Sequence, residues 1–166
     1  MNILRSPEGG PLRVVVDSII KKEYQRRGAV HWHMLIWVEP GTAPPNAVMA
    51  EMPRAADTSD VRVRKLLENM LQHKTCYPSR CFKGSHGKVL SKCKYGFPFD
   101  VPHETVCLDE DGVRYLYVRR HDEDKNVVPY NPEIAILWGA AHNVQIVSKH
   151  GSRCTWLSTS PNQSQA

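Results

Sequence analysis

Two histidines separated by one tryptophan stand at the head of an apolar run, His31-Trp-His-Met-Leu-Ile-Trp-Val38. The run is short and rich in aromatic and branched residues, which predicts a strand over Val30–Val38. Because successive side chains of a strand point to opposite faces, His31 and His33 are expected to share one face. Two imidazoles held side by side on a strand supply half of a metal site.

The residues before this run predict its partner strand. Their β-branched side chains favour a strand beginning near Ile19 and running through Gln25, with a helix over Leu12–Ile20 as the alternative. A turn at Arg27-Gly28 then makes a hairpin that brings Glu23 beside the two histidines. One carboxylate and two neutral imidazoles suit Mn²⁺ or Mg²⁺ and leave positions open for phosphate oxygens, with Gln25 as an alternative ligand.

The rest of the chain mixes helix and strand signals. A proline-rich loop covers residues 39–60, and Ser59 is the expected N-cap of a helix from Asp60 to about His73. Further expectations are a strand over 112–119, an extended segment over 127–132, a short helix or turn over 133–138 and a last strand over 141–147.

A second candidate metal site lies in the loop that follows the predicted helix. His73, Cys76, Cys81 and Cys93 give one imidazole and three thiolates, a set suited to structural Zn²⁺, and His86 competes with His73 as the fourth ligand. The alternative is three free cysteines in a loop. A loop with so little apolar content would gain much of its order from a metal ion.

The same loop is strongly basic. No acidic residue occurs between Glu68 and Asp100, whereas lysines, an arginine and four aromatic residues are interleaved there. Cations that pair with phosphates and rings on which bases stack are typical of a single-stranded nucleic-acid channel. The alternative is a solvated loop with a few core aromatics. The candidate DNA-binding residues are Arg26, Arg27, Lys83, Lys88, Lys92 and Lys94.

The whole composition agrees with such a partner without requiring it. The 166 residues carry a formal charge of +5, and no apolar run is long enough to cross a membrane. Five cysteines without a secretory signal indicate a reduced, intracellular protein.

Several blocks of the sequence, in order, resemble one family. The stretch Glu23-Tyr-Gln-Arg-Arg-Gly-Ala-Val-His-Trp-His33 resembles the HUH motif of the Helitron replication-initiator (Rep) nuclease domain, also called the Helitron helicase-like domain. The later blocks that match are Cys93-Lys-Tyr-Gly-Phe-Pro98, Tyr115 to Arg120, Val127-Val-Pro-Tyr-Asn-Pro132 and His142-Asn-Val-Gln145. The match covers roughly residues 12–151.

The resemblance implies an α+β fold of the relaxase-like HUH type, an antiparallel sheet flanked by helices. It also implies cleavage and rejoining of single-stranded DNA during rolling-circle transposition. It implies that His31 and His33, with Glu23 as a third ligand, hold the metal that polarises the scissile phosphate. A tyrosine would then attack and form a 5′-phosphotyrosine. In a eukaryotic cell such a protein is expected in the nucleus.

The chain departs from this family pattern after Gly151. The family places two tyrosines four residues apart there, as in Tyr-Leu-Ala-Lys-Tyr, whereas the last tyrosine here is Tyr130. We therefore expect an enzyme without its nucleophile, or a metal-stabilised nucleic-acid-binding module that never was catalytic. Residues 1–11 are expected to be a leader or a truncated edge and 152–166 a disordered tail. The family normally carries a helicase domain in the same polypeptide, and we expect a protein without one.

The tail suggests how the nucleophile was lost. In the frame that joins the third base of each codon to the first two of the next, codons for Cys154 to Thr159 can encode Tyr-Leu-Ala-Lys-Tyr. We predict that a frameshift just after Gly151 replaced the catalytic helix, and the genomic sequence across this junction tests it. An alternative frame without two tyrosines four apart would rule the frameshift out.

Overall fold

The protein is a small α+β domain in the computed structural model, with two antiparallel sheets and a few helices. The structure describes residues 10–24, 30–39, 42, 46–54, 58–108, 114–146 and 157–159. The α+β class is as predicted, but the described strands form two separate sheets rather than one. Among the described residues, no helix is long and apolar enough to cross a membrane.

The first sheet is built on the predicted hairpin. β1 (Val15–Tyr24) pairs antiparallel with β2 (Val30–Val38), and a register shift lies between Val15 and Asp17. β2 has the predicted bounds, whereas β1 begins four residues before Ile19, and the alternative helix over 12–20 is wrong. The register sets Glu23 opposite His31, because antiparallel partners share a face of the sheet.

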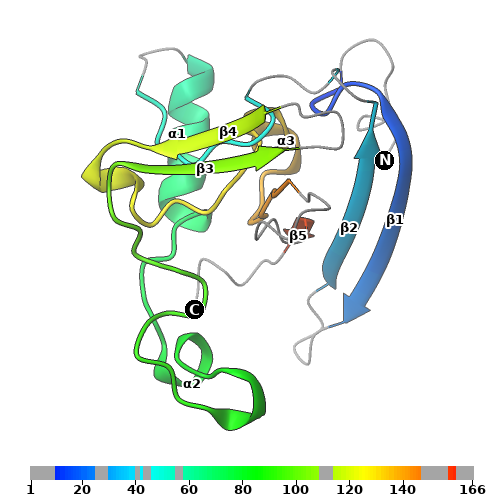
Figure 1. Ribbon diagram of the computed structural model, residues 1–166. Coiled ribbons are helices and arrows are strands. Elements are labelled where there is room, and N and C mark those ends of the chain that lie inside the picture. Colours follow the sequence, from blue (N-terminus) through cyan, green and yellow to red (C-terminus); the bar gives the residue numbers. More distant parts are fainter. Residues whose placement is uncertain are drawn as a thin grey trace.

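The second sheet is the hairpin of β3 (His103–Leu108) and β4 (Arg114–Arg119), which lies apart from β1 and β2 in Figure 1. β4 matches the strand predicted over 112–119, whereas β3 was not predicted. Its partner register runs from His103 opposite Arg119 to Leu108 opposite Arg114.

The main core forms between two helices and an extended segment. α1 (Thr58–Met70) carries Val63 and Leu67 on its buried face, and Leu71, the residue directly after the helix, continues their helical spacing. All three side chains are at most 2% exposed. The helix is shorter at its end than predicted, and Ser59 lies in its first turn rather than at the N-cap. The three buried side chains of the helix pack with Val127 and Tyr130. The extended segment predicted over 127–132 is confirmed, since Val127 bridges to Gln72 and Tyr130 to Met49.

α3 (Pro132–Trp138) joins this core to the first sheet. It confirms the helix option for residues 133–138 and is capped by the Asn131 side chain, which accepts a hydrogen bond from the Ile134 backbone N–H. Gly139 ends it in the left-handed conformation that glycine adopts without strain. Ile134 belongs to a second core cluster, against which Ile36 and Val38 of β2 pack.

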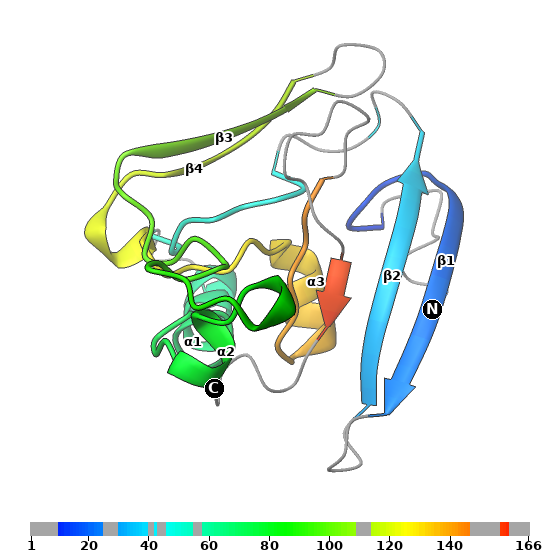
Figure 2. The same ribbon diagram turned by 60° about the horizontal axis from the view of Figure 1, so that its bottom comes forward.

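The expectations for the irregular segments have different outcomes. The described part of the proline-rich loop, residues 46–54, contains no helix or strand, as predicted, but it is packed into the core, since Ala50 and Met52 are 1% and 2% exposed. The last strand predicted over 141–147 is wrong, because residues 141–146 contain only an isolated bridge residue. In the tail, Leu157–Thr159 forms a short β5 that pairs with β2 opposite Trp32 to Met34 (Figure 2).

One fully buried carboxylate ties distant segments together. Asp124, in the 3₁₀ turn η3 (Asp122–Asp124), is 0% exposed. It accepts hydrogen bonds from the backbone N–H groups of Met52, Arg120 and His121 and from the Arg54 guanidinium, at 2.7 to 3.0 Å. Because all four donors depend on one side chain, the carboxylate fixes the buried half of the loop against the end of β4.

Removing this carboxylate should destabilise the protein strongly. We expect Asp124→Ala to lower the free energy of unfolding by about 2–4 kcal/mol, because three backbone N–H groups and a cation lose their acceptor. Asp122→Ala is the matched control, since its side chain is 87% exposed and forms an ion pair with Lys125 at the surface. Its expected loss is under about 0.5 kcal/mol. Equal losses in urea unfolding would contradict the role given to Asp124.

Candidate metal centre

Three cysteines and a histidine converge in the segment between α1 and β3. His73 lies just after α1, Cys81 ends the short helix α2 (Pro78–Cys81), and Cys76 and Cys93 lie in the turns on either side. We call residues 73–97 the metal lobe. Figure 1 shows that it projects from the two sheets, at the bottom of the view.

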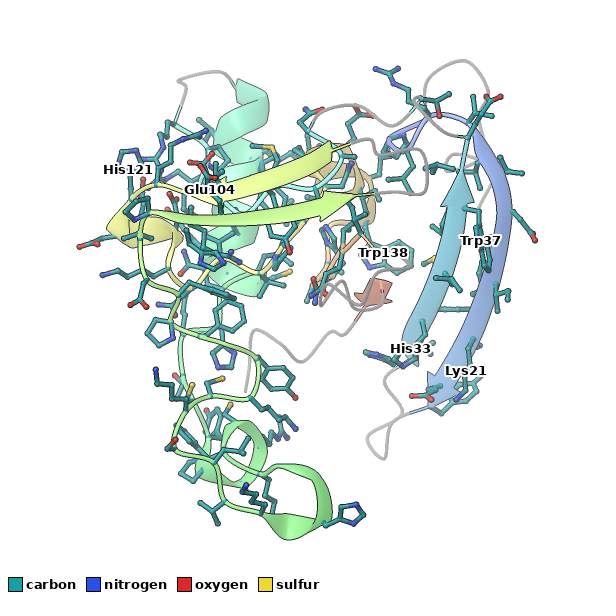
Figure 3. The ribbon with its side chains drawn as sticks, in the orientation of Figure 1. Lys21, His33, Trp37, Glu104, His121 and Trp138 are labelled. Carbon is teal, nitrogen blue, oxygen red and sulfur yellow. The ribbon has the colours of Figure 1, made fainter. Side chains whose placement is uncertain are left out.

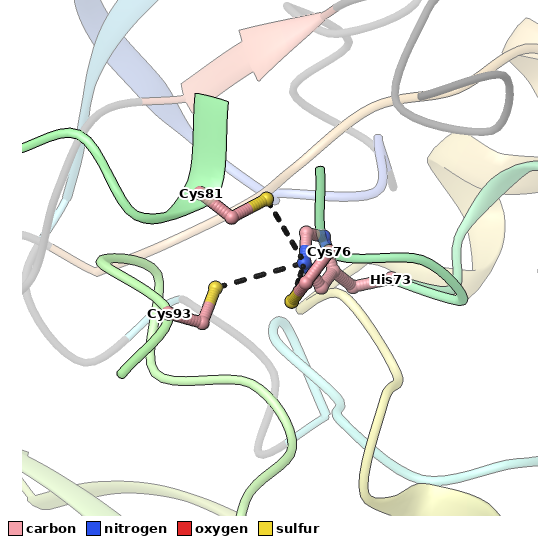
Figure 4. A group of neighbouring side chains, drawn as sticks. All are labelled: His73, Cys76, Cys81 and Cys93. Carbon is pink, nitrogen blue, oxygen red and sulfur yellow. Dashed lines mark hydrogen bonds between the residues drawn. The ribbon is translucent and has the colours of Figure 1, made fainter. Parts of the chain in front are cut away.

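The four ligand atoms have the spacing of one metal site. All lie within 4.8 Å of one another. The Nε2 atom of His73 is 3.1 Å from the Sγ of Cys76 and 3.6 Å from those of Cys81 and Cys93 (Figure 4). Tetrahedral coordination with ordinary zinc bond lengths would put a nitrogen about 3.6 Å from each sulfur. The cluster could therefore hold one metal ion.

The backbone of the metal lobe places these sulfurs. The Cys81 carbonyl accepts a hydrogen bond from the Lys94 N–H, which holds the two cysteine-bearing turns together. Gly96 N–H donates to the Cys93 carbonyl and closes a tight turn, with a φ of +85° at the glycine. A side chain there would be strained and would also meet the Phe99 ring at 3.1 Å.

The surroundings of the cluster favour metal ligation over exposed thiol chemistry. Cys81 and Cys93 are 3% and 8% exposed, and the His73 ring stacks on Phe97 with centroids 4.8 Å apart. Burial lowers the pKa of His73, which favours the neutral imidazole that binds metals. Burial and the neighbouring thiols raise the pKa of Cys76 to about 12, so a cation is needed to form the thiolate.

The structure decides between the two candidate fourth ligands. His73 joins the cluster, whereas His86 lies exposed in the turn η2 (Ser85–Gly87), so the alternative with His86 is wrong. The four side chains predicted as a metal set are thus brought together. Sequence inspection missed Phe97, which positions the His73 ring.

The histidine pair of β2 lies in a different region. The His31 and His33 rings meet edge to face with centroids 4.5 Å apart, and Glu23 Oε2 is 3.2 Å from His33 Nε2. The predicted position of Glu23 beside the histidines is confirmed. In the described part of the chain, however, these three residues do not form a set spaced like the cysteine cluster.

A lysine that sequence inspection overlooked contacts this group. Lys21 stands opposite His33 in the register and its Nζ is 2.9 Å from Glu23 Oε1. Figure 3 shows Lys21 and His33 at the same end of the hairpin, away from Trp37. Its position two residues before Glu23, on the same strand face, is the signal that could have revealed it.

The electrostatics of the pair suit a neutral imidazole beside a carboxylate. The pKa of His31 is lowered, first by burial and then by the charge of His33. Hydrogen bonds from Lys21 and His33 lower the pKa of Glu23. His31 is 8% exposed, and its buried Nδ1 has no hydrogen-bond partner among the described residues.

The candidate DNA-binding residues divide in two groups. Lys83, Lys88, Lys92 and Lys94 are exposed on the metal lobe. Arg26 and Arg27 lie outside the described residues, as does Gln25, the alternative ligand of the hairpin.

Comparison with known proteins assigns no family. No family model, curated protein or solved structure matches the chain.

The cysteine cluster predicts a distinctive response to cobalt. Co²⁺ added to metal-free protein should give the visible absorption and sulfur charge-transfer bands of a tetrahedral thiolate site. Cys93→Ser should weaken these bands strongly, whereas Cys107→Ser should leave them unchanged, because Cys107 lies on β3. Retention of the full spectrum by Cys93→Ser would contradict the assigned ligand set.

Proposed function

We propose that this chain is a single-stranded DNA-binding domain of the Helitron Rep type, with an HUH-like metal site and without a nicking nucleophile. The observation that carries the proposal is the cross-strand arrangement of one carboxylate and two imidazoles. Glu23 stands opposite His31 and contacts His33, which supports a shared ligand set of these three residues.

The residues of the hairpin would hold Mn²⁺ or Mg²⁺ against a DNA phosphate. The Nδ1 of His31 supports this, because it has no hydrogen-bond partner among the residues that the structure describes, and a buried ring nitrogen in that state is costly unless a ligand or water meets it. Coordination of the ion would replace the hydrogen bond between Glu23 and His33. Once bound, the ion would neutralise and polarise the phosphate.

Cleavage itself is not part of the proposal. A phosphotyrosine needs a tyrosine aligned with the metal-bound phosphate, and Tyr130, the last tyrosine, is 0% exposed in the core. Its hydroxyl donates a hydrogen bond to the Glu51 carbonyl. The chain would thus bind the strand without joining to it.

The cysteine cluster would act as a structural zinc site in the same domain. Three thiolates and one imidazole are a zinc donor set, and such sites contribute directly to folding. The cluster is also what favours a second candidate function, a non-catalytic nucleic-acid-binding module stabilised by zinc, in which the histidine pair has no metal role.

Manganese-dependent DNA binding separates the two functions. We expect Mn²⁺ to tighten binding of a labelled oligothymidine, measured by fluorescence anisotropy, with no covalent band on a denaturing gel. His31→Ala with His33→Ala should weaken the manganese-dependent part at least about tenfold.

The control is His86→Ala, which removes an exposed histidine away from the hairpin. Unchanged manganese dependence in the double variant would contradict the HUH-like site and favour the zinc-stabilised module. A covalent protein–DNA band would contradict the absence of nicking.

A further inference from the structure

The metal lobe lacks an ordinary hydrophobic core. Its buried side chains are the ligands Cys81 and Cys93, and Val89 is 80% exposed. Backbone hydrogen bonds hold its turns, among them those from Gly84 to Lys88, from Leu90 to Phe82, from Lys94 to Cys81 and from Gly96 to Cys93. The shape of this lobe therefore depends on the cysteine cluster at its centre.

The surface of the metal lobe is a cluster of unpaired cations. Six basic side chains are exposed there, and in the described part of the chain none of them forms an ion pair: Lys74, Arg80, Lys83, Lys88, Lys92 and Lys94. Elsewhere cations such as Arg64 and Arg120 are neutralised by carboxylates. Because the lobe has no acidic residue, its cations are available to phosphates.

Two tyrosine rings stand exposed among these cations. Tyr95 is 54% exposed and Tyr77 is 42% exposed. Both flank the cluster in sequence, since Tyr77 follows Cys76 and Tyr95 comes two residues after Cys93. The Lys94 ammonium lies 5.0 Å from the centre of the Tyr95 ring. A base stacked on this ring would have a cation beside it for its phosphate.

We infer that the metal lobe is a second DNA contact, which binds a single strand by stacking its bases on Tyr95 and Tyr77. This binding requires a metal ion in the cysteine cluster. The inference rests on the proposed function in taking single-stranded DNA as the ligand. It does not depend on the histidine pair. Single strands are required because paired bases do not offer their faces to the rings.

The metal dependence follows from how the rings are positioned. The backbone around Tyr95 is fixed by the turn from Cys93 to Gly96 and by the hydrogen bond of Lys94 to Cys81. Without an ion, contacts among three thiols and an imidazole are too weak to offset the conformational entropy gained when these turns separate. The lysines would still attract phosphates, but the stacking platform would be lost.

Stacking is tested with full-length, zinc-loaded protein and a labelled oligothymidine in the absence of Mn²⁺. We expect Tyr95→Ala to weaken binding at least about fivefold and Tyr95→Phe to retain it, because phenylalanine keeps the ring. A duplex of the same length should bind markedly less tightly. Equal binding of duplex and single strand, or of Tyr95→Ala and the unmodified chain, would overturn the inference. Tighter binding of oligouridine would overturn the assignment to DNA.

The cation contacts are tested by salt dependence. Lys92→Ala and Lys94→Ala should each reduce the slope of log affinity against log salt by about 0.7. Lys65→Ala, an exposed lysine on α1, is the matched control and should not change the slope. A slope that responds equally to all three substitutions would contradict a binding surface on the metal lobe.

The metal requirement is tested by removing and restoring zinc. Chelation should weaken oligothymidine binding and abolish the difference between Tyr95→Ala and the unmodified chain, and added Zn²⁺ should restore both. Limited proteolysis should then cut within residues 74–94 and leave the remaining core intact. Unchanged affinity and an unchanged effect of Tyr95→Ala in metal-free protein would overturn the metal requirement.

The two sites can fail independently. The variant with both His31→Ala and His33→Ala should keep zinc-dependent binding, and Tyr95→Ala should keep the manganese response. Loss of the Tyr95 effect alone would reject the lobe contact and leave the proposed HUH-like site standing.

Discussion

The convergence of His73, Cys76, Cys81 and Cys93 on one point is the constraint on which the projecting part of this protein depends. The metal lobe buries too few apolar side chains to offset the conformational entropy of ordering its turns. The four ligand atoms nevertheless lie within 4.8 Å of one another. An ion bound there would supply the free energy that hydrophobic packing supplies elsewhere.

The cluster is also continuous with the body of the domain. The His73 ring stacks on Phe97, and Phe97 meets Phe99 edge to face at 5.1 Å. Phe99 in turn lies under the guanidinium of Arg119, 3.9 Å from the ring centre. Burial lowers the pKa of Arg119 to about 10, yet the side chain remains a cation at neutral pH. A chain of packed rings thus connects the metal ligand to β4.

Local sequence patterns predicted what local geometry determines. The alternation around His31 and His33 predicted β2 and its partner strand, because strand period and turn chemistry fix the register that places Glu23. The spacing of cysteines predicted the ligand set, but not the choice of His73 over His86. That choice depends on the His73 ring stacking on Phe97, which spacing does not reveal.

Features set by distant contacts were missed. Met52 is buried in a proline-rich segment because Asp124, far along the chain, accepts its backbone N–H. β3 forms a strand because it pairs with β4. Residues 141–146 have the apolar pattern of a strand, but Val144 is buried in the second core cluster and no described strand pairs with this segment. Such burial follows from tertiary packing and has no local signature.

X-ray absorption at the metal edge of the purified protein tests the central claim most directly. The account predicts one zinc ion per chain with three sulfur neighbours at about 2.3 Å and one nitrogen at about 2.0 Å. A chain that carries no stoichiometric metal, or an ion surrounded only by nitrogen and oxygen, would contradict the metal-organised lobe.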